Sequence, residues 1–253
     1  MSDDTLDAPA WYGKLPSLGD FASRRWPPEL LEPWDAWLAA GLADWREHDP
    51  ADWLAHYLAS PSWRFVLMPG ALMPGALMSG APLPGVLGGE AQAHAGVLMP
   101  SVDRVGRYFP FTLLQPLPAL PGTDAQWRDL LAWLHRLDDL AVDALQDDWP
   151  VERLEAELVS PGLGLPASLG DAGDARPPAS AEVPMTVSVG PDLAGWVARQ
   201  AARQAHRAWQ GQSWWWCTGT DGDTVLKIEQ GLPRGRGFQT LLCLPPRHEG
   251  AGP

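Results

Sequence analysis

The chain has few of the residues on which many recognisable functions depend. Its 253 residues include only two cysteines, Cys217 and Cys243, with neither a Cys-x-x-Cys spacing nor a histidine cluster nearby. This pattern excludes a zinc ribbon and a disulfide framework, and we expect both thiols to be reduced and buried. Residues 1–7 are acidic and have neither the basic nor the apolar part of a secretory signal. These features together predict a cytoplasmic protein.

Familiar catalytic signatures are also missing. The sequence has no GxSxG nucleophile motif, no Walker loop, no HExxH pair and no Rossmann glycine triplet. Its six histidines are scattered, with no two at metal-ligand spacing. We therefore expect no catalytic residue, no metal and no cofactor, and we favour a protein that is not an enzyme.

Positive charge is scarce, since the formal net charge is −13 and lysine occurs only twice. Such a chain is not expected to bind nucleic acid or an anionic membrane surface. One run, from Phe65 to the residue before Glu90, has no charged side chain, but its repeated prolines and glycines break any helix. Direct membrane insertion is therefore not expected.

The uncharged run contains a repeat with a period of five residues. The units are Leu67–Ala71 and Leu72–Ala76, both Leu-Met-Pro-Gly-Ala, and the variant Leu77–Ala81. The sequence predicts an insert loop over 68–90. It is either a tolerated surface insertion or a methionine-rich adhesive loop for a partner.

Tryptophan is abundant, with fifteen residues, and most of them fall at helical or strand spacing, which indicates core positions. Helices and strands alternate along the chain. Strands are expected within 10–25 and at 63–67, 94–99, 108–115, 185–189, 214–218 and 224–229; helices at 28–45, 50–58, 124–147, 150–158 and 192–210; and a last apolar, strand-like run at 238–244.

This alternation predicts the α/β class. We expect a three-layer sandwich in which a central mixed or largely antiparallel sheet is covered by helices on both faces. One domain is expected over 1–253: a motif-bearing core at 10–120 with the 68–90 insert, a flexible loop at 160–184 rich in Gly, Pro, Ala and Ser, and a C-terminal part at 185–246 that completes the sheet.

Polar side chains are concentrated between two apolar runs in the segment 96–111. The candidate site comprises Ser101, Asp103, Arg104 and Arg107 together with Lys14 and Asp20. Buried polar groups need partners, and guanidinium groups form bidentate bonds with carboxylates or phosphates. We weigh two interpretations: an internal ion-pair network that pins a strand connection, which we favour, and an exposed anion-binding or partner-docking patch.

Several motifs occur in a specific order. They are Gly13-Lys-Leu-Pro-Ser-Leu-Gly-Asp-Phe21, Trp34 with Trp37, Tyr57-Leu-Ala-Ser-Pro61, Trp63-Arg-Phe65 and Gly96-Val-Leu-Met-Pro-Ser-Val-Asp-Arg-Val-Gly-Arg107. In combination they resemble the TagF family, also called ImpM, of type VI secretion-associated proteins. The pentapeptide repeats depart from the family pattern.

The resemblance implies a cytoplasmic accessory protein that represses the type VI secretion system after translation. It implies contact with the forkhead-associated-domain scaffold protein of the system and with components of its membrane complex. No catalytic residues are implied. Our hypothesis is thus a non-enzymatic regulator acting by protein–protein contact. The alternative is a small hydrolase or phosphate-handling enzyme that uses Asp20, Asp103, Arg104 and Arg107.

Overall fold

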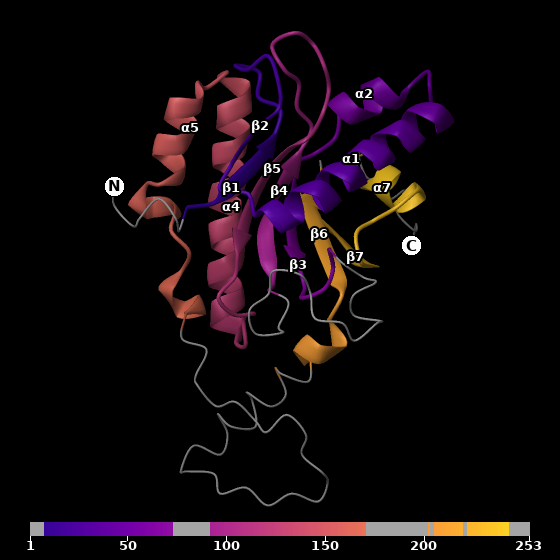
Figure 1. The fold of residues 1–253 in the computed structure, drawn as a ribbon. Helices are drawn as coiled ribbons and strands as arrows, with labels where there is room; N and C mark the ends of the chain where they lie inside the picture. The colour runs from indigo at the N-terminus through magenta and orange to yellow at the C-terminus, as the bar shows by residue number, and fades with distance from the viewer. Residues whose placement is uncertain (1–7, 73–91, 171–201, 203–204, 220–221, 243–253) are drawn as a thin grey trace, which may run out of the picture.

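A seven-stranded sheet forms the centre of the protein (Figure 1). The computed structural model describes residues 8–72, 92–170, 202, 205–219 and 222–242. The strand order is β2-β1-β5-β4-β3-β6-β7, and every neighbouring pair is antiparallel. The strands are β1 (Ala10–Gly13), β2 (Ala22–Arg24), β3 (Trp63–Leu67), β4 (His94–Met99), β5 (Phe111–Pro116), β6 (Gln212–Thr218) and β7 (Thr224–Gln230). The predicted α/β class with a largely antiparallel sheet is confirmed.

The helices divide into two groups by the core that they enter. Those whose bounds lie within the described residues are α1 (Pro28–His48), α2 (Trp53–Leu58), α4 (Asp124–Gln146), α5 (Val151–Leu158) and α7 (Arg236–Leu241). Residues of α1, α2 and α7 lie in one hydrophobic cluster, and residues of α4 and α5 lie in another. Alternate residues of the strands enter the two clusters: Phe65 of β3 belongs to the first and Val66 to the second. The two cores therefore lie on opposite faces of the sheet.

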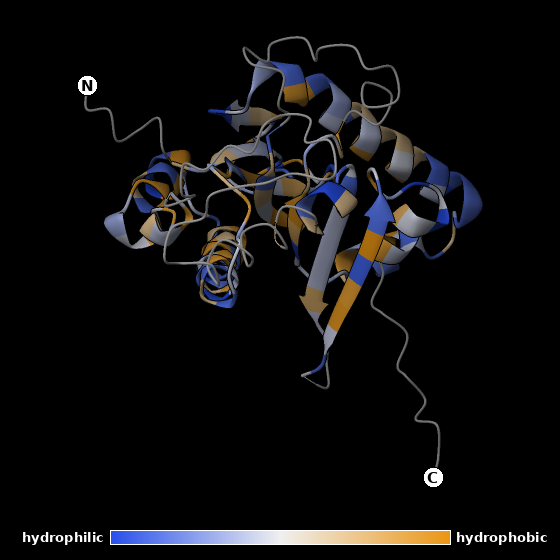
Figure 2. Ribbon diagram, turned by 90° about the horizontal axis from the view of Figure 1, so that it is seen from below, coloured by the Kyte–Doolittle hydropathy of each residue, from blue (hydrophilic) through white to orange (hydrophobic). Residues whose placement is uncertain are grey.

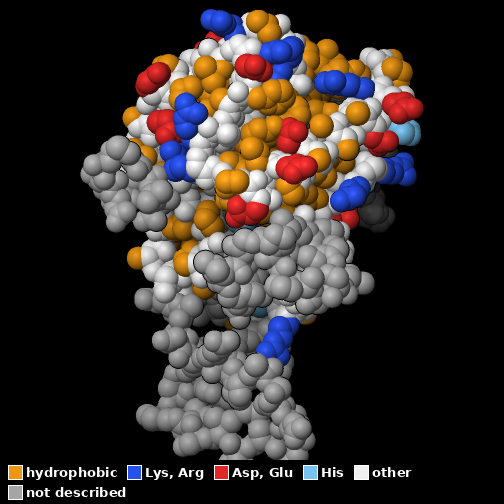
Figure 3. All heavy atoms as spheres, in the orientation of Figure 1, with side chains coloured by type: hydrophobic (Ala, Val, Ile, Leu, Met, Phe, Trp, Pro, Cys, Tyr) orange, Lys and Arg blue, Asp and Glu red, His pale blue; other side chains and the backbone are white. Residues whose placement is uncertain are grey.

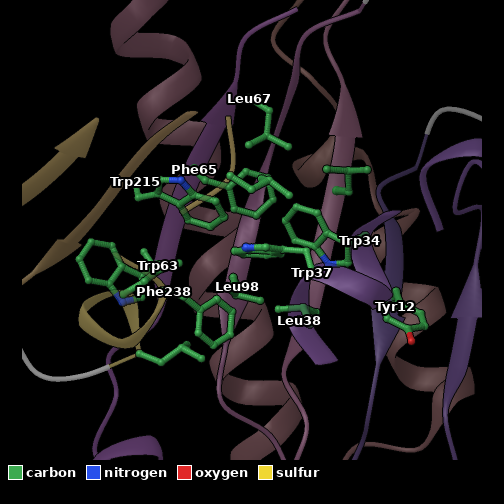
Figure 4. Packing of buried hydrophobic residues seen from close by; sticks show 14 of the residues in the cluster. Tyr12, Trp34, Trp37, Leu38, Trp63, Phe65, Leu67, Leu98, Trp215 and Phe238 are labelled. Carbon is green, nitrogen blue, oxygen red and sulfur yellow. The ribbon is translucent and has the colours of Figure 1, made fainter. Parts of the chain in front are cut away.

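The first core is built largely from aromatic rings (Figure 4). Trp34 of α1 lies 4.8 Å from Trp37 and 5.6 Å from Phe65, measured between ring centroids. Its indole N–H donates a hydrogen bond of 3.1 Å to Oγ1 of Thr112 on β5. Trp37 in turn donates to the carbonyl oxygen of Pro233, over 2.6 Å. These two buried indoles thus each have an acceptor, whereas the indole nitrogens of Trp26 and Trp63 in the same core are buried without a hydrogen-bond partner among the described residues.

The second core is dominated by α4. This helix begins after Thr123, whose hydroxyl accepts a hydrogen bond from the backbone N–H of Gln126, the usual role of an N-cap threonine. One face then repeats at helical spacing, and Leu130, Trp133, Leu134 and Leu137 are fully buried. The helix thereby holds β3 and β4 from the side opposite α1.

The C-terminal strands form one edge of the sheet. β6 pairs with β3, and β7 pairs only with β6 among the strands that the structure describes. Seen from below, β7 alternates between hydrophilic and hydrophobic residues (Figure 2). Two of its apolar side chains, Leu226 and Ile228, are exposed.

One sequence-based expectation is wrong, and two others are confirmed only in part or with other bounds. The run 238–244 was expected to resemble a strand, but Arg236–Leu241 is helix α7, which buries Phe238 and Leu241 at an i, i+3 spacing. Residues 161–163 and 167–169 form 3₁₀ turns that bury Leu163 and Leu169, so the start of the expected 160–184 loop is packed on the second core. The strand expected at 108–115 begins at Phe111, because the preceding residues form a loop closed by a bridge between Val102 and Tyr108.

Other expectations concern residues outside the described part of the chain. These are most of the insert at 68–90, the strand at 185–189, most of the helix at 192–210, Cys243, and the rest of the loop at 160–184. Cys217 is described, and its thiol is free and buried. No helix among the described residues has the length and apolarity to cross a membrane.

Candidate functional site

Two loops meet at one end of the sheet, and an ion pair joins them. The first loop follows β1 and carries Lys14; the second connects β4 to β5 and carries Asp103. The Lys14 ammonium nitrogen lies 2.8 Å from Oδ2 of Asp103, and the two side chains are 4% and 0% exposed. Gly13 brings the first loop this close: its φ is +129°, and a Cβ there would overlap the carbonyl oxygen of Pro110.

The carboxylate of Asp103 is the centre of this network. Its Oδ1 accepts the backbone N–H groups of Val105 and Arg107, over 3.0 and 2.9 Å. Its Oδ2 accepts the Lys14 ammonium and Nε of Arg107, over 2.8 and 2.7 Å. Burial by itself raises the pKa of a carboxyl group, but these hydrogen bonds outweigh it and hold the pKa of Asp103 well below its ordinary value.

Ser101 is fixed by the same junction. Its hydroxyl donates to the carbonyl oxygen of Lys14 over 2.7 Å. Its backbone exchanges hydrogen bonds with the hydroxyl of Tyr57 on α2: Tyr57 donates to the Ser101 carbonyl and accepts from the Ser101 N–H, each over 2.9 Å. Ser101, Lys14 and Asp103 are all buried. For these three residues the geometry is that of the internal ion-pair network.

The arginines lie further out. Arg107 donates from Nη2 to the Gly19 carbonyl over 2.5 Å and lies 3.6 Å from Oδ1 of Asp20, and both of these side chains are largely exposed. Arg104 donates only its backbone N–H, to the carbonyl oxygen of Leu18 over 2.8 Å. Its exposed guanidinium forms no hydrogen bond or ion pair with a described residue. Five of the six predicted residues thus share one network, and the Arg104 side chain stands outside it.

Sequence reasoning missed two residues of this junction. The Lys14 ammonium lies 4.8 Å from the ring centroid of Phe21, and the Phe21 ring packs edge-on against that of Phe109, 4.8 Å between centroids. Tyr57 comes from a helix 44 residues before Ser101. Phe21 could have been found as an aromatic side chain next to a Gly-Asp turn, whereas nothing local to Tyr57 distinguishes it from a core residue.

A separate groove of about 480 Å³ lies between α1 and α7. Its walls include Trp37, Gly41, Leu232 and Phe238, and its ionisable side chains are those of Asp44 and Arg234. It has no serine, cysteine, histidine or tyrosine among its lining residues. Within the described parts of the chain, no three His, Cys, Asp or Glu side chains gather in a way that could hold a metal ion.

The structure defines an α/β protein with an antiparallel sheet and a buried ion pair between two of its loops. Comparison with known proteins identifies the family within this class. The family described as TagF N-terminal domain, type VI secretion system-associated, matches residues 10–160. This chain belongs to that family. Its matched region contains β1 to β5, α1, α2, α4 and α5, and both loops of the ion-paired junction.

The solved structures extend the likeness beyond that region. A crystal structure of PA0076 from Pseudomonas aeruginosa PAO1 shares 32% sequence identity with this chain at a TM-score of 0.64. The similarity covers 97% of this chain and 99% of that one. No curated protein matches the chain.

Proposed function

We propose that this chain is a non-enzymatic, post-translational repressor of the type VI secretion system that acts by protein–protein contact in the cytoplasm. The observation that carries the proposal is the family match over residues 10–160. The partner proposed is the forkhead-associated-domain scaffold protein of the system, and through it components of the membrane complex.

The geometry of the polar cluster supports a role that is not catalytic. The Ser101 hydroxyl donates its hydrogen bond to the Lys14 carbonyl oxygen. This acceptor is not a base that could activate the hydroxyl as a nucleophile. The Asp103 carboxylate accepts four hydrogen bonds and keeps a low pKa, which leaves it poorly suited to proton transfer near neutral pH.

One observation favours the alternative, a small hydrolase or phosphate-handling enzyme using Asp20, Asp103, Arg104 and Arg107. The guanidinium groups of Arg104 and Arg107 belong to one exposed turn, and such groups bind phosphate well. Tight binding of inorganic phosphate that Arg104→Ala abolishes, with folding retained, would support this alternative.

The proposal is tested with purified full-length chain and purified scaffold protein, by titration calorimetry, and with secretion assays in a host that carries an active system. We expect saturable binding of the scaffold and reduced secretion when the chain is overproduced. Absence of both effects would contradict the proposal. Binding without reduced secretion would retain the partner and remove the repressor role.

A further inference from the structure

The outer end of the ion-paired junction presents cationic and apolar groups together. We call the exposed residues Phe21, Arg104, Val105 and Arg107 the loop tip. Phe21 and Val105 are 45% and 64% exposed, which is unusual for large hydrophobic side chains in this protein. The two loops form one end of the molecule (Figure 1), and there Lys or Arg side chains lie among hydrophobic ones (Figure 3). A surface of this composition is typical of the centre of a protein interface, where arginine and aromatic residues are enriched.

The loop tip is held in one conformation by buried contacts. Asp103 fixes the turn beneath Val105 through backbone hydrogen bonds, and the Lys14 ammonium ties that turn to the first loop. Phe21 is supported from below by Phe109 and by the Lys14 ammonium. Because folding has already ordered these groups, binding of a partner costs less conformational entropy.

The charges of the loop tip indicate the chemistry of the partner. Arg104 has a guanidinium without a described ion-pair partner, and Arg107 is about half exposed, in a chain with a net charge of −13. A carboxylate from another protein can form a bidentate pair with Arg104. Apolar side chains beside that carboxylate would bury the exposed side chains of Phe21 and Val105.

A polyanion fits this surface poorly. The negative net charge of the whole chain repels a nucleic acid or an anionic lipid surface. The exposed carboxylate of Asp20 lies 3.6 Å from Arg107, inside the same surface. A phosphate backbone also offers nothing apolar to Phe21. A short segment with a few carboxylates among apolar residues brings far less negative charge to this surface than a polyanion and supplies an apolar contact for Phe21.

We infer that the loop tip is the docking surface for an acidic, apolar-containing segment of a partner protein, with Arg104 as its main charge contact. This inference rests on the proposed function, since it names the surface through which the repressor would bind. In this inference the buried residues Lys14, Ser101 and Asp103 position the two loops. The exposed residues of the loop tip contact the partner.

The first test uses the purified forkhead-associated scaffold and full-length variants. Arg104→Glu is expected to weaken binding about tenfold or more, because it sets two like charges against each other. Arg104→Gln is expected to have a smaller effect and to reduce the salt dependence of binding. Arg128→Glu, the same charge change at an exposed position of α4, is the control and should bind like the natural chain.

The second test places a photo-crosslinking amino acid at Val105, with exposed Leu131 of α4 as the control position, in cells that carry the secretion system. Crosslinking at Val105 but not at Leu131, mapped to a partner peptide rich in Asp or Glu, would support the inference. Equal crosslinking at both positions, or a neutral or basic peptide at Val105, would overturn it.

The outcomes separate the two proposals. Scaffold binding that is unchanged by Arg104→Glu would contradict the loop tip as the docking surface. The proposed regulatory function would remain. No scaffold binding even by the natural chain would overturn the proposed partner, and the crosslinked peptide at Val105 would then decide the loop tip by itself. Binding to vesicles of anionic lipid that Arg104→Glu abolishes would overturn the protein partner.

Discussion

The ammonium group of Lys14 lies 2.8 Å from the carboxylate of Asp103, in the interior of the protein and 89 residues away along the chain. Lys14 is one of only two lysines in the sequence. Two opposite charges that are removed from water stabilise a fold only when their geometry is good and their other hydrogen bonds are satisfied. Here the pair fixes two loops relative to one another, and the exposed residues of both loops lie directly outside it.

Removing one partner of this pair should destabilise the protein more than removing both. Lys14→Met leaves the Asp103 carboxylate buried without its ammonium, and we expect Tm to fall by about 10 °C. Lys14→Met/Asp103→Asn carries no buried charge and should lose clearly less. Thermal unfolding followed by circular dichroism measures both variants. Equal losses in the single and double variants would contradict a coupled pair.

The stability of the protein should decrease as the pH falls from about 6.5 toward 4. Burial lowers the pKa of His94 to about 4, and its backbone hydrogen bond to Gln92 only partly opposes that shift. Between these pH values the unfolded chain binds a proton at His94 that the folded chain does not bind. The free energy of unfolding therefore falls by up to about 1.4 kcal/mol per pH unit.

Urea unfolding at several pH values measures this dependence. The slope should be smaller in His94→Gln. It should not vanish, because the pKa of His206 is also lowered by burial. An unchanged slope would show that His94 is not held neutral.

A second acid transition should belong to Asp103. Because its folded pKa is depressed, its contribution to stability is present above its ordinary pKa of 3.8 and is lost as the pH falls below that value. In Asp103→Asn the unfolding free energy should therefore change less between pH 5 and pH 3 than in the natural chain. Chemical denaturation at these two pH values is the measurement, and Asp20→Asn, at an exposed position, is the control.

The hydroxyl of Thr112 should matter more than its methyl group. It accepts the indole N–H of Trp34 in the first core, where both side chains are fully buried. Thr112→Val leaves that N–H without an acceptor and should cost about 1–3 kcal/mol of unfolding free energy. Thr112→Ser keeps the oxygen and is the matched control. If valine is as stable as serine at this position, the hydroxyl matters no more than the methyl group.

Gly96→Ala should be severely destabilising. A Cβ at Gly96 would overlap the carbonyl oxygen of Leu113 on the neighbouring strand and lie 2.7 Å from the ring of Phe65. Both obstacles are in the centre of the sheet, where neither strand can move away. We expect little folded protein in size-exclusion chromatography. Gly162→Ala, where a new Cβ meets nothing within 4 Å, is the control and should fold normally.

Local patterns were sufficient for most of the elements. The helix that carries Trp34 and Trp37 and the long helix that carries Trp133 were predicted, because apolar spacing at 3.6 residues is a local property. The strand Trp63–Leu67 and the hairpin strands expected at 214–218 and 224–229 were predicted from short apolar runs and, for the hairpin, from the Gly-Thr-Asp-Gly-Asp turn between them. Helix α7 was missed because six residues are too few to separate a helical from a strand-like apolar run.

By itself, the sequence determined the class of fold, the family, and the six polar residues worth considering, since composition, periodicity and ordered motifs are all written along the chain. Only the tertiary structure decided which of those residues are buried. Exposure depends on contacts such as those of Ser101 with Tyr57 and of Lys14 with Asp103, made between segments distant in sequence. The same contacts turned one predicted cluster into two parts: an ion pair inside the protein and, at Arg104, an exposed guanidinium at its surface.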